Sequence, residues 1–154
     1  MDSGITVERL THEALEYVAA NCREIDRREI RLSVGVGPLL ALEVSEVRSV
    51  AAWSGSYNGV PMVVFGVNYR GPLDRDVGVP WLVATPELEK HQKGFLRRCK
   101  PYVDRMELVF PRMENHVLAE NTTAIGWLRW LGFDIGEAVP YGIGRAKFHP
   151  FTKG

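Results

Sequence analysis

The sequence predicts a single α/β (α+β) domain over residues 1–154, with a mixed, mainly antiparallel sheet flanked by helices. Apolar periods of two and of about 3.6 residues alternate in the order strand, two helices, three strands, helix, strand, helix, two strands. Asn58-Gly59 predicts a tight hairpin, and helical stretches between the later strands predict one parallel pair. A length of 154 residues suits one compact domain with its own core.

The first half of the chain is expected to hold short elements with clear boundaries. In order, they are a strand over 5–7, a helix over 12–22, a charged helical or connecting stretch over 23–32, a helix over 38–46, and strands over 48–53 and 61–69. Thr11 can cap the first helix, and Pro38 suits the first position of the last helix. The Asn58-Gly59 pair favours a type I′ turn because both residues tolerate positive φ.

The second half is expected to alternate strands and helices after a loop over 71–76. Its elements are a strand over 77–85, a helix over 94–106, short strand or helix-end stretches over 107–110 and 116–119, a helix over 122–131, and a closing hairpin over 134–141 and 145–148. Trp81 to Ala84 is a near-continuous apolar run, which is typical of a strand buried on both faces. Pro101 should kink or divide its helix.

The helix over 122–131 has the best-defined ends. Asn121 or Thr122 can cap its first turn. The positions i, i+3, i+4 and i+7 form an apolar stripe, made up of Ala124, Trp127, Leu128 and Leu131. Gly132 and Phe133 then predict a Schellman stop, with Phe133 folding back on Leu128.

Composition excludes several function classes. Lys plus Arg and Asp plus Glu each number 19, so there is no net field to attract nucleic acid or an anionic membrane. The clusters at Arg23, Arg27, Arg28 and Arg31, and at Arg97, Arg98 and Lys100, are interpreted as solvated helix faces. No window reaches the ~18 apolar residues of a membrane span. Cys22 and Cys99 are expected to be buried free thiols, with no metal site, in a cytoplasmic protein.

Three local patterns resemble the GNAT acyltransferase superfamily across roughly residues 48–150. They are Leu82-Val-Ala-Thr-Pro-Glu87 with the helix after it, Asn121 with Ala124, and Leu131-Gly-Phe133. The resemblance implies a GNAT-like domain that binds acetyl-CoA or another acyl-CoA and acylates an amine of unknown identity. It places the cofactor beside the central-strand backbone and at a helix N-terminus, where amides and the helix dipole favour phosphate. The implied cofactor-binding residues are Leu82, Val83, Ala84, Thr85, Lys93, Gly94 and Asn121.

The sequence departs from that pattern in two places. The stretch Glu89-Lys-His-Gln-Lys-Gly94 has one glycine where the family uses a glycine-rich phosphate loop. Leu128 stands where the family often has a tyrosine acid. Catalytic residues therefore stay unassigned, with Tyr102 or Tyr141 as substitute acids. The candidate bases, chosen by residue type alone, are Glu43, Glu46, Glu120 and His116.

A narrower resemblance points to bacteriophage. Trp81-Leu-Val-Ala-Thr-Pro-Glu, the Trp127-to-Phe133 helix and the Phe148-His-Pro-Phe151 ending resemble a GNAT-like family of short-tailed phages and prophages, which includes internal virion protein A. This resemblance implies an alternative function: a catalytically degenerate virion assembly protein, found in the bacterial host or the virion. The tail aromatics Tyr141, Phe148 and Phe151 would then be exposed to dock on phage structural proteins. The paired Trp127 and Trp130, and His149, fit structural packing equally well.

Overall fold

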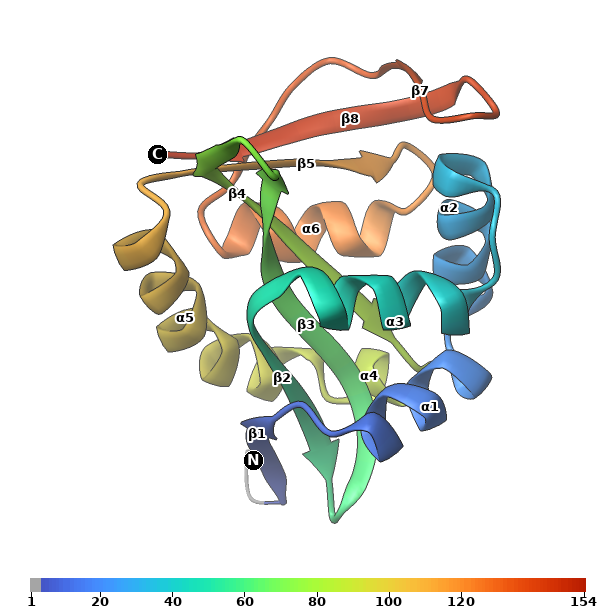
Figure 1. The fold of residues 1–154 in the computed structure, drawn as a ribbon. Coiled ribbons are helices and arrows are strands. Elements are labelled where there is room, and N and C mark those ends of the chain that lie inside the picture. The colour runs from blue at the N-terminus through green and yellow to red at the C-terminus, as the bar shows by residue number, and fades with distance from the viewer. Residues whose placement is uncertain (1–3) are drawn as a thin grey trace.

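The computed structural model describes residues 4–154 and contains one sheet with helices on both of its faces (Figure 1). In chain order the elements are β1 (Ile5–Arg9), α1 (His12–Asn21), α2 (Glu24–Val34), α3 (Pro38–Arg48), β2 (Ser49–Tyr57), β3 (Val60–Gly71), β4 (Asp74–Ala84), α4 (Glu87–Lys90), α5 (Gln92–Val109), β5 (Arg112–Leu118), α6 (Thr122–Trp130), β6 (Asp134–Ile135), β7 (Val139–Tyr141) and β8 (Ala146–Lys153). This is the predicted element order with three additions: α2, where the sequence left a helix or a connecting stretch open, the one-turn helix α4, and a split final hairpin.

The strands follow the order β1-β2-β3-β4-β5-β8-β6, with β7 paired to the other part of β8. All pairings are antiparallel except β4–β5, which is parallel, because α5 crosses over between those two strands. The β2–β3 hairpin turns through Asn58 (φ 50°) and Gly59 (φ 83°), as the Asn-Gly pair predicts. The mixed, mainly antiparallel sheet is thereby confirmed.

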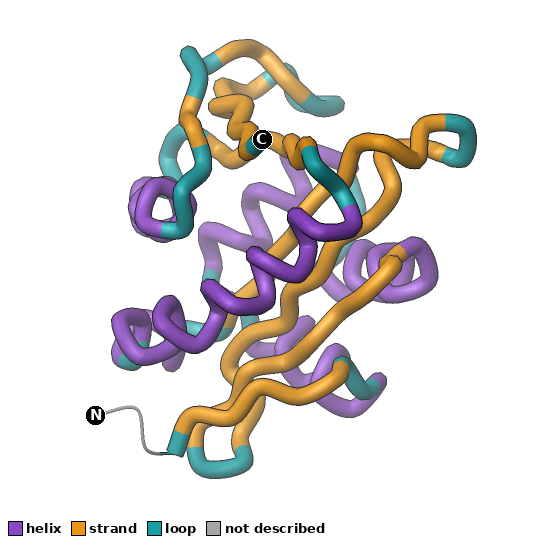
Figure 2. Tube along the Cα trace, turned by 90° about the vertical axis from the view of Figure 1, so that its left-hand side faces the viewer, coloured by secondary structure: helices purple, strands orange, loops and turns teal. Residues whose placement is uncertain are grey.

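Two apolar clusters lie on opposite faces of the sheet. Figure 2 shows the helices on both sides of the strands. One cluster joins Leu15 and Val18 of α1 to Leu42 of α3, against Val64 and Val83 of the sheet. The larger cluster lies under α5 and α6 and contains, among others, Phe95, Cys99, Trp127, Phe65 and Phe151. The alternation along β3 and β4 sends neighbouring residues to different clusters, so the central strands are buried on both sides.

The ends of α6 match the sequence pattern. Asn121 Oδ1 accepts a hydrogen bond from the Ala124 N–H at 3.4 Å, which makes Asn121 the N-cap. At the other end Gly132 has φ 95°, and the N–H groups of Gly132 and Phe133 donate to the carbonyls of Arg129 and Leu128. These two bonds define the Schellman stop.

Several local expectations were wrong. Pro101 does not divide its helix, since α5 runs from Gln92 to Val109 as one element, and the alternative of a kink stays a prediction. The stretch over 74–76, expected as loop, is the start of β4, paired with β3 through Gly71↔Asp74. The tail aromatics expected on the surface are mostly core: Phe148 and Phe151 are 1% and 5% exposed, and Tyr141 stacks on His116. The β8 strand is longer than expected and turns these residues inward.

Candidate functional site

The parallel strands β4 and β5 pair only at their beginnings. Val77↔Arg112 and Gly78↔Met113 are in register, and beyond them no pairing joins the two strands although β4 continues to Ala84 and β5 to Leu118. At this apex a Cβ on Gly78 would lie 2.7 Å from the Phe110 ring, so only glycine fits. The strands therefore diverge into a V-shaped gap, called here the β4–β5 gap.

A cavity of ≈ 450 Å³ occupies the β4–β5 gap and passes through the sheet. It is lined by Phe65, Leu96 and Cys99 on the α5 face, and by Ile30, Ala41 and Trp81 on the α2–α3 face. A ligand in the gap would thus contact both faces of the sheet. That arrangement lets two substrates meet from opposite sides.

Near the apex, one side chain bridges the gap. Asn115 on β5 donates from Nδ2 to the Pro80 carbonyl at 2.8 Å, and its Oδ1 accepts from the His116 N–H at 2.8 Å. Both backbone groups face the gap, and the asparagine satisfies them where no strand partner is present.

At the wide end of the gap, the start of α2 takes the place of a strand partner for β4. The Arg23 N–H donates to the Ala84 carbonyl at 2.8 Å, and the Ala84 N–H donates to Asp26 Oδ2 at 2.9 Å. Both gap-facing backbone groups of Ala84 are therefore satisfied within the chain. Because Pro80 and Ala84 both face the gap, alternation directs the N–H and C=O of Leu82 into it as well.

Arg23 and Asp26 form a buried ion pair, with 4% and 3% of their surface exposed. The guanidinium grips the carboxylate through Nη2–Oδ1 at 2.6 Å and Nε–Oδ2 at 3.1 Å, and its Nη1 reaches Glu89 at 3.1 Å. Burial disfavours the charged guanidinium, but Asp26 and Glu89 outweigh that effect and raise the pKa of Arg23. Burial raises the pKa of Asp26, while Arg23 and the Ala84 N–H oppose the rise.

The two strands that border the gap are called here its β4 arm and its β5 arm. Glu29 lies one turn further along α2 than Asp26 and caps the β5 arm. Its Oε1 accepts the Leu118 N–H of β5 at 2.6 Å. Unlike Asp26, it has no ion-pair partner within 4.0 Å among residues 4–154. Burial, with a further contribution from the Asp26 charge, raises the pKa of Glu29 to about 7, and Asn121 and the Leu118 N–H oppose that rise.

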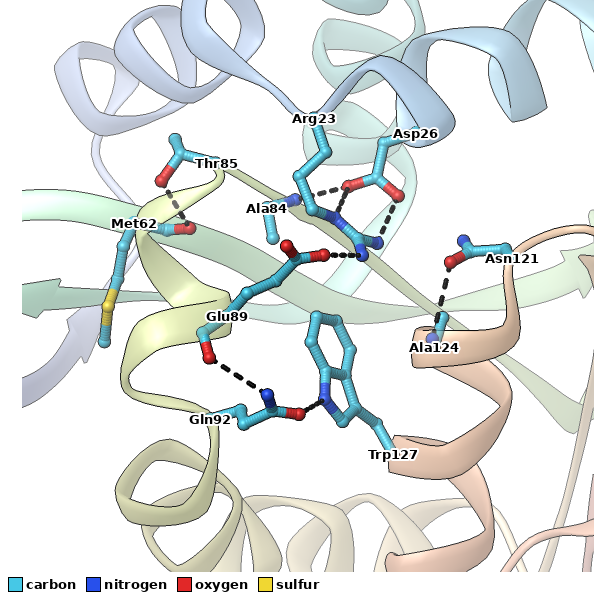
Figure 3. A network of polar contacts seen from close by, with 10 residues as sticks. All are labelled: Arg23, Asp26, Met62, Ala84, Thr85, Glu89, Gln92, Asn121, Ala124 and Trp127. Carbon is cyan, nitrogen blue, oxygen red and sulfur yellow. Dashed lines mark hydrogen bonds and ion pairs between the residues drawn. The ribbon is translucent and has the colours of Figure 1, made fainter.

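Asn121 stands beside both carboxylates at the end of β5 and is 2% exposed. Its Oδ1 is used to cap α6, as seen in Figure 3. Its Nδ2 is the one buried side-chain nitrogen or oxygen in the described part of the chain that makes no hydrogen bond within normal distance and angle limits. A buried amide donor without a partner is costly, and it marks a place where a ligand oxygen would fit.

A second set of contacts joins α6 to the start of α5 (Figure 3). Trp127 Nε1 donates to Gln92 Oε1 at 2.8 Å, and Gln92 Nε2 donates to the Glu89 carbonyl at 2.9 Å. The Arg23 guanidinium lies over the Trp127 ring at 4.8 Å. Arg23, Glu89, Gln92 and Trp127 thereby bridge the wide end of the gap from α2 to α6.

A second cavity of ≈ 410 Å³ lies at the N-terminus of α5. Its walls hold Glu89, Lys90, His91, Gln92, Lys93, Gly94, Arg97 and Ile5. Two lysines and a helix N-terminus favour an anion here, although Glu89 contributes the opposite charge. Lys93 and Gly94 belong to this cavity, whereas Leu82, Val83 and Asn121 line the cavity in the β4–β5 gap.

The predicted central-strand residues differ in what they offer a ligand. Leu82 and Val83 line the cavity in the gap. Ala84 has its backbone groups occupied by Arg23 and Asp26. Thr85 donates both its N–H (2.9 Å) and its hydroxyl (3.3 Å) to the Met62 carbonyl, so it faces β3 rather than the gap.

Some of the candidate catalytic residues line the cavity in the gap, and the others lie away from it. His116 and Tyr141 line the cavity, with ring centroids 3.8 Å apart, and burial lowers the pKa of His116. Glu43 and Glu46 instead lie 4.0 and 3.5 Å from His12, outside the cavity lining. Glu120 pairs with Arg28 at 3.1 Å on the surface.

Tyr102 packs edge-on against Trp53 and is absent from the cavity lining, so its placement does not favour the role of acid. Leu128 does line the cavity, which puts an apolar side chain where a hydroxyl was sought.

Arg23, Asp26 and Glu29 are the site residues that sequence reasoning missed. The stretch over 23–32 was interpreted as a solvated charged face, which was wrong for Arg23. Their spacing of i, i+3 and i+6 places them near one another on a helix, and that was the available signal. The sequence contained no sign that this side would face the gap.

Comparison with known proteins was made at three levels. No family model matches the chain, and no curated protein matches it. Among solved structures, it is similar to a protein of Salmonella typhimurium described as an acetyltransferase with its cofactor acetyl-CoA, at 15% identity and TM-score 0.67, covering 98% of this chain and 94% of that one. It is also similar to the ribosomal-protein-alanine N-acetyltransferase of Brucella melitensis, at 13% identity and TM-score 0.69, covering 96% and 98%.

A third similar structure is an acetyltransferase of the GNAT family from Streptococcus pneumoniae, at 11% identity and TM-score 0.63, covering 97% and 98%. At such identities the likeness establishes the fold. The chain therefore has the GNAT fold, with the strand divergence and cavity described above. Within residues 4–154 no helix combines the length and the apolar character needed to cross a membrane.

Proposed function

We propose that the protein is an acyl-CoA-dependent N-acyltransferase whose acyl transfer takes place in the β4–β5 gap. The observation that carries the proposal is the cavity through the sheet, between strands that stop pairing after Gly78 and Met113. The fold supports it, because a structure of the same fold is described with acetyl-CoA. The acceptor is an amine whose identity is open.

The residues of the gap and of the start of α5 fit an acyl-CoA in three respects. The gap-facing N–H and C=O of Leu82 are suited to amide groups of an extended arm, as a neighbouring strand would be. Asn121 Nδ2, which lies beside Asp26 and Glu29 without a hydrogen bond of normal geometry, would donate to a ligand carbonyl. Lys93 and Gly94, at the start of α5, would lie near phosphate groups. When bound, acyl-CoA supplies a thioester-activated acyl group.

The proposal is tested by isothermal titration of the protein, at about 100 μM, with acetyl-CoA. We expect saturable binding with a Kd below about 100 μM. Asn121→Ser is the informative variant, since serine still caps α6 but has no amide. It should weaken binding about tenfold, the value of one hydrogen bond. Asn21→Ser, at an exposed asparagine of α1, is the matched control. Absence of any heat above dilution would overturn the proposal.

A second candidate is a protein that keeps this fold without the chemistry and serves in phage virion assembly. It is favoured by one observation, the occupation of both Ala84 backbone groups by Arg23 and Asp26. These contacts close the β4 arm where a cofactor would otherwise pair. Leu128 in place of a hydroxyl acid agrees with it. Stable co-purification with phage structural proteins, together with no acetyl-CoA binding, would favour this candidate.

A further inference from the structure

Glu29 is the carboxylate in the cavity lining that lacks a cation. The other one, Asp26, is paired with Arg23, whereas Glu29 accepts the Leu118 N–H on Oε1, lies beside the Asn121 amide and makes no ion pair within residues 4–154. Glu29 is half-buried, and a partly desolvated carboxylate with no cation paired to it is unfavourable. A cationic ligand in the cavity would supply the missing charge.

The residues that line the cavity around Glu29 indicate the chemistry of that ligand. On the α2–α3 side it is lined mainly by apolar residues, among them Ile30, Ala41 and Trp81, together with Ser33 and Ser45. The other charged or titratable lining groups are Arg23 and Asp26, already paired, Arg48 at the exposed end of α3, His116, Tyr141 and Cys99, a thiol whose pKa burial raises to about 12. Burial lowers the pKa of His116, so this imidazole is neutral at pH 7 and does not repel a cation. An apolar chain bearing one ammonium group fits this lining.

We infer that Glu29 binds the ammonium group of a primary alkylamine through Oε2 and then accepts one proton from its nitrogen. One N–H bond breaks, its electron pair stays on nitrogen, and an O–H bond forms on Oε2. Ammonium and carboxylate thus become neutral amine and carboxylic acid. The bound pair rests as ammonium and carboxylate, and partial burial reduces the cost of the transfer because the transfer removes two charges from a partly desolvated site. The proton returns to solvent after the product leaves.

The role of the amine as acyl acceptor rests on the proposed function, but binding of the amine to Glu29 can be measured in the absence of acyl-CoA. The Leu118 amide resonance reports on Glu29, because that N–H donates to Oε1. Glu29 has a pKa of about 7, so the resonance should titrate near that pH. Added n-butylamine should lower the midpoint by about one pH unit, since an ammonium stabilises the carboxylate. The neutral analogue n-butanol should leave it unchanged.

Glu29→Gln is the matched variant, since a glutamine oxygen can still accept the Leu118 N–H. It should abolish both the titration and its response to amine while leaving acetyl-CoA affinity within about twofold. With n-butylamine as acceptor, kcat/KM should fall about 100-fold, and the decline of activity below pH 7 should disappear. Glu120→Gln, at an exposed pair with Arg28, controls for loss of a nearby charge.

Each outcome separates the two ideas. If wild type binds no acetyl-CoA but its Leu118 resonance responds to n-butylamine and not to n-butanol, the amine site stands and acyl transfer fails. If acetyl-CoA is bound and turned over equally by wild type and Glu29→Gln, with one shared pH profile, acyl transfer stands and the role of Glu29 is overturned. A Leu118 resonance that is insensitive to about 50 mM n-butylamine also overturns it.

Discussion

On each arm of the β4–β5 gap a carboxylate of α2 accepts a backbone N–H, but only one of the two carboxylates is paired with a cation. On the β4 arm Asp26 accepts the Ala84 N–H, and Arg23 neutralises it. On the β5 arm Glu29, one turn away on the same helix, accepts the Leu118 N–H with no cation beside it. The comparison teaches that the charge of Asp26 is balanced within the fold, whereas the charge of Glu29 has no paired cation and can be balanced by a ligand.

The largest expected effect comes from making the β4 arm resemble the β5 arm. Arg23→Met leaves Asp26 buried with no cation, which should lower the free energy of unfolding by about 3–5 kcal/mol. Urea unfolding followed by circular dichroism measures it. Arg28→Met, whose pair with Glu120 is exposed, should change stability by no more than about 0.5 kcal/mol. Equal effects of the two variants would show that the buried pair is no more important than a surface one.

The pH dependence of stability sharpens the comparison on the other arm. The folded pKa of Glu29 is raised from 4.5 to about 7, so the native state holds this proton more tightly than the unfolded state. Its stabilisation is complete below pH 4.5 and is lost as the pH rises through about 7. The loss is about 3 kcal/mol, and Glu29→Gln should not show it. The measurement is the difference in unfolding free energy between the two proteins from pH 4 to 8; a constant difference would contradict it.

Neutralising each carboxylate at pH 8 should give opposite signs. Asp26→Asn removes the main partner of a buried guanidinium, leaving Arg23 with Glu89, and should destabilise the fold by about 2 kcal/mol. Glu29→Gln removes an uncompensated charge and should stabilise it. Thermal and urea unfolding of the two single variants and the double variant measure both effects and their coupling. The same sign for both variants would remove the distinction between the arms.

The elements whose residues interact locally could be predicted from the sequence. The Asn58-Gly59 turn, the Thr11 and Asn121 caps and the Gly132 stop each depend on residues within a few positions of one another. The antiparallel hairpin pairing and the one parallel pair followed from these elements and from the helical crossover before β5. The inward-facing tail aromatics could not be predicted, because their burial depends on β8 pairing with β5 from the far end of the chain.

The candidate site was predictable only where it lies on the strands and the cap. Leu82, Val83 and Asn121 are at the gap because β4 and the α6 cap place them there. Asp26 and Glu29 were missed because their partners, Ala84 and Leu118, are 58 and 89 positions away. A charged helix face has the same residue pattern whether it meets water or the orphan amides of two diverging strands.

The smallest expected effect comes from a variant that tests whether α6 stabilises the β4 arm without affecting the β5 arm. Trp127→Phe removes the donor to Gln92 Oε1 and reduces the contact with the Arg23 guanidinium, while most of the buried ring area stays. The cost should be about 1 kcal/mol of unfolding free energy. Trp130→Phe, at a half-exposed position on the same helix, should change stability by less than about 0.5 kcal/mol. Because Trp127 contacts Arg23 and not Glu29, the Leu118 resonance should titrate with an unchanged midpoint in Trp127→Phe. A shifted midpoint would mean that the two arms are coupled through α6 and that Glu29 does not titrate independently of the Arg23–Asp26 pair.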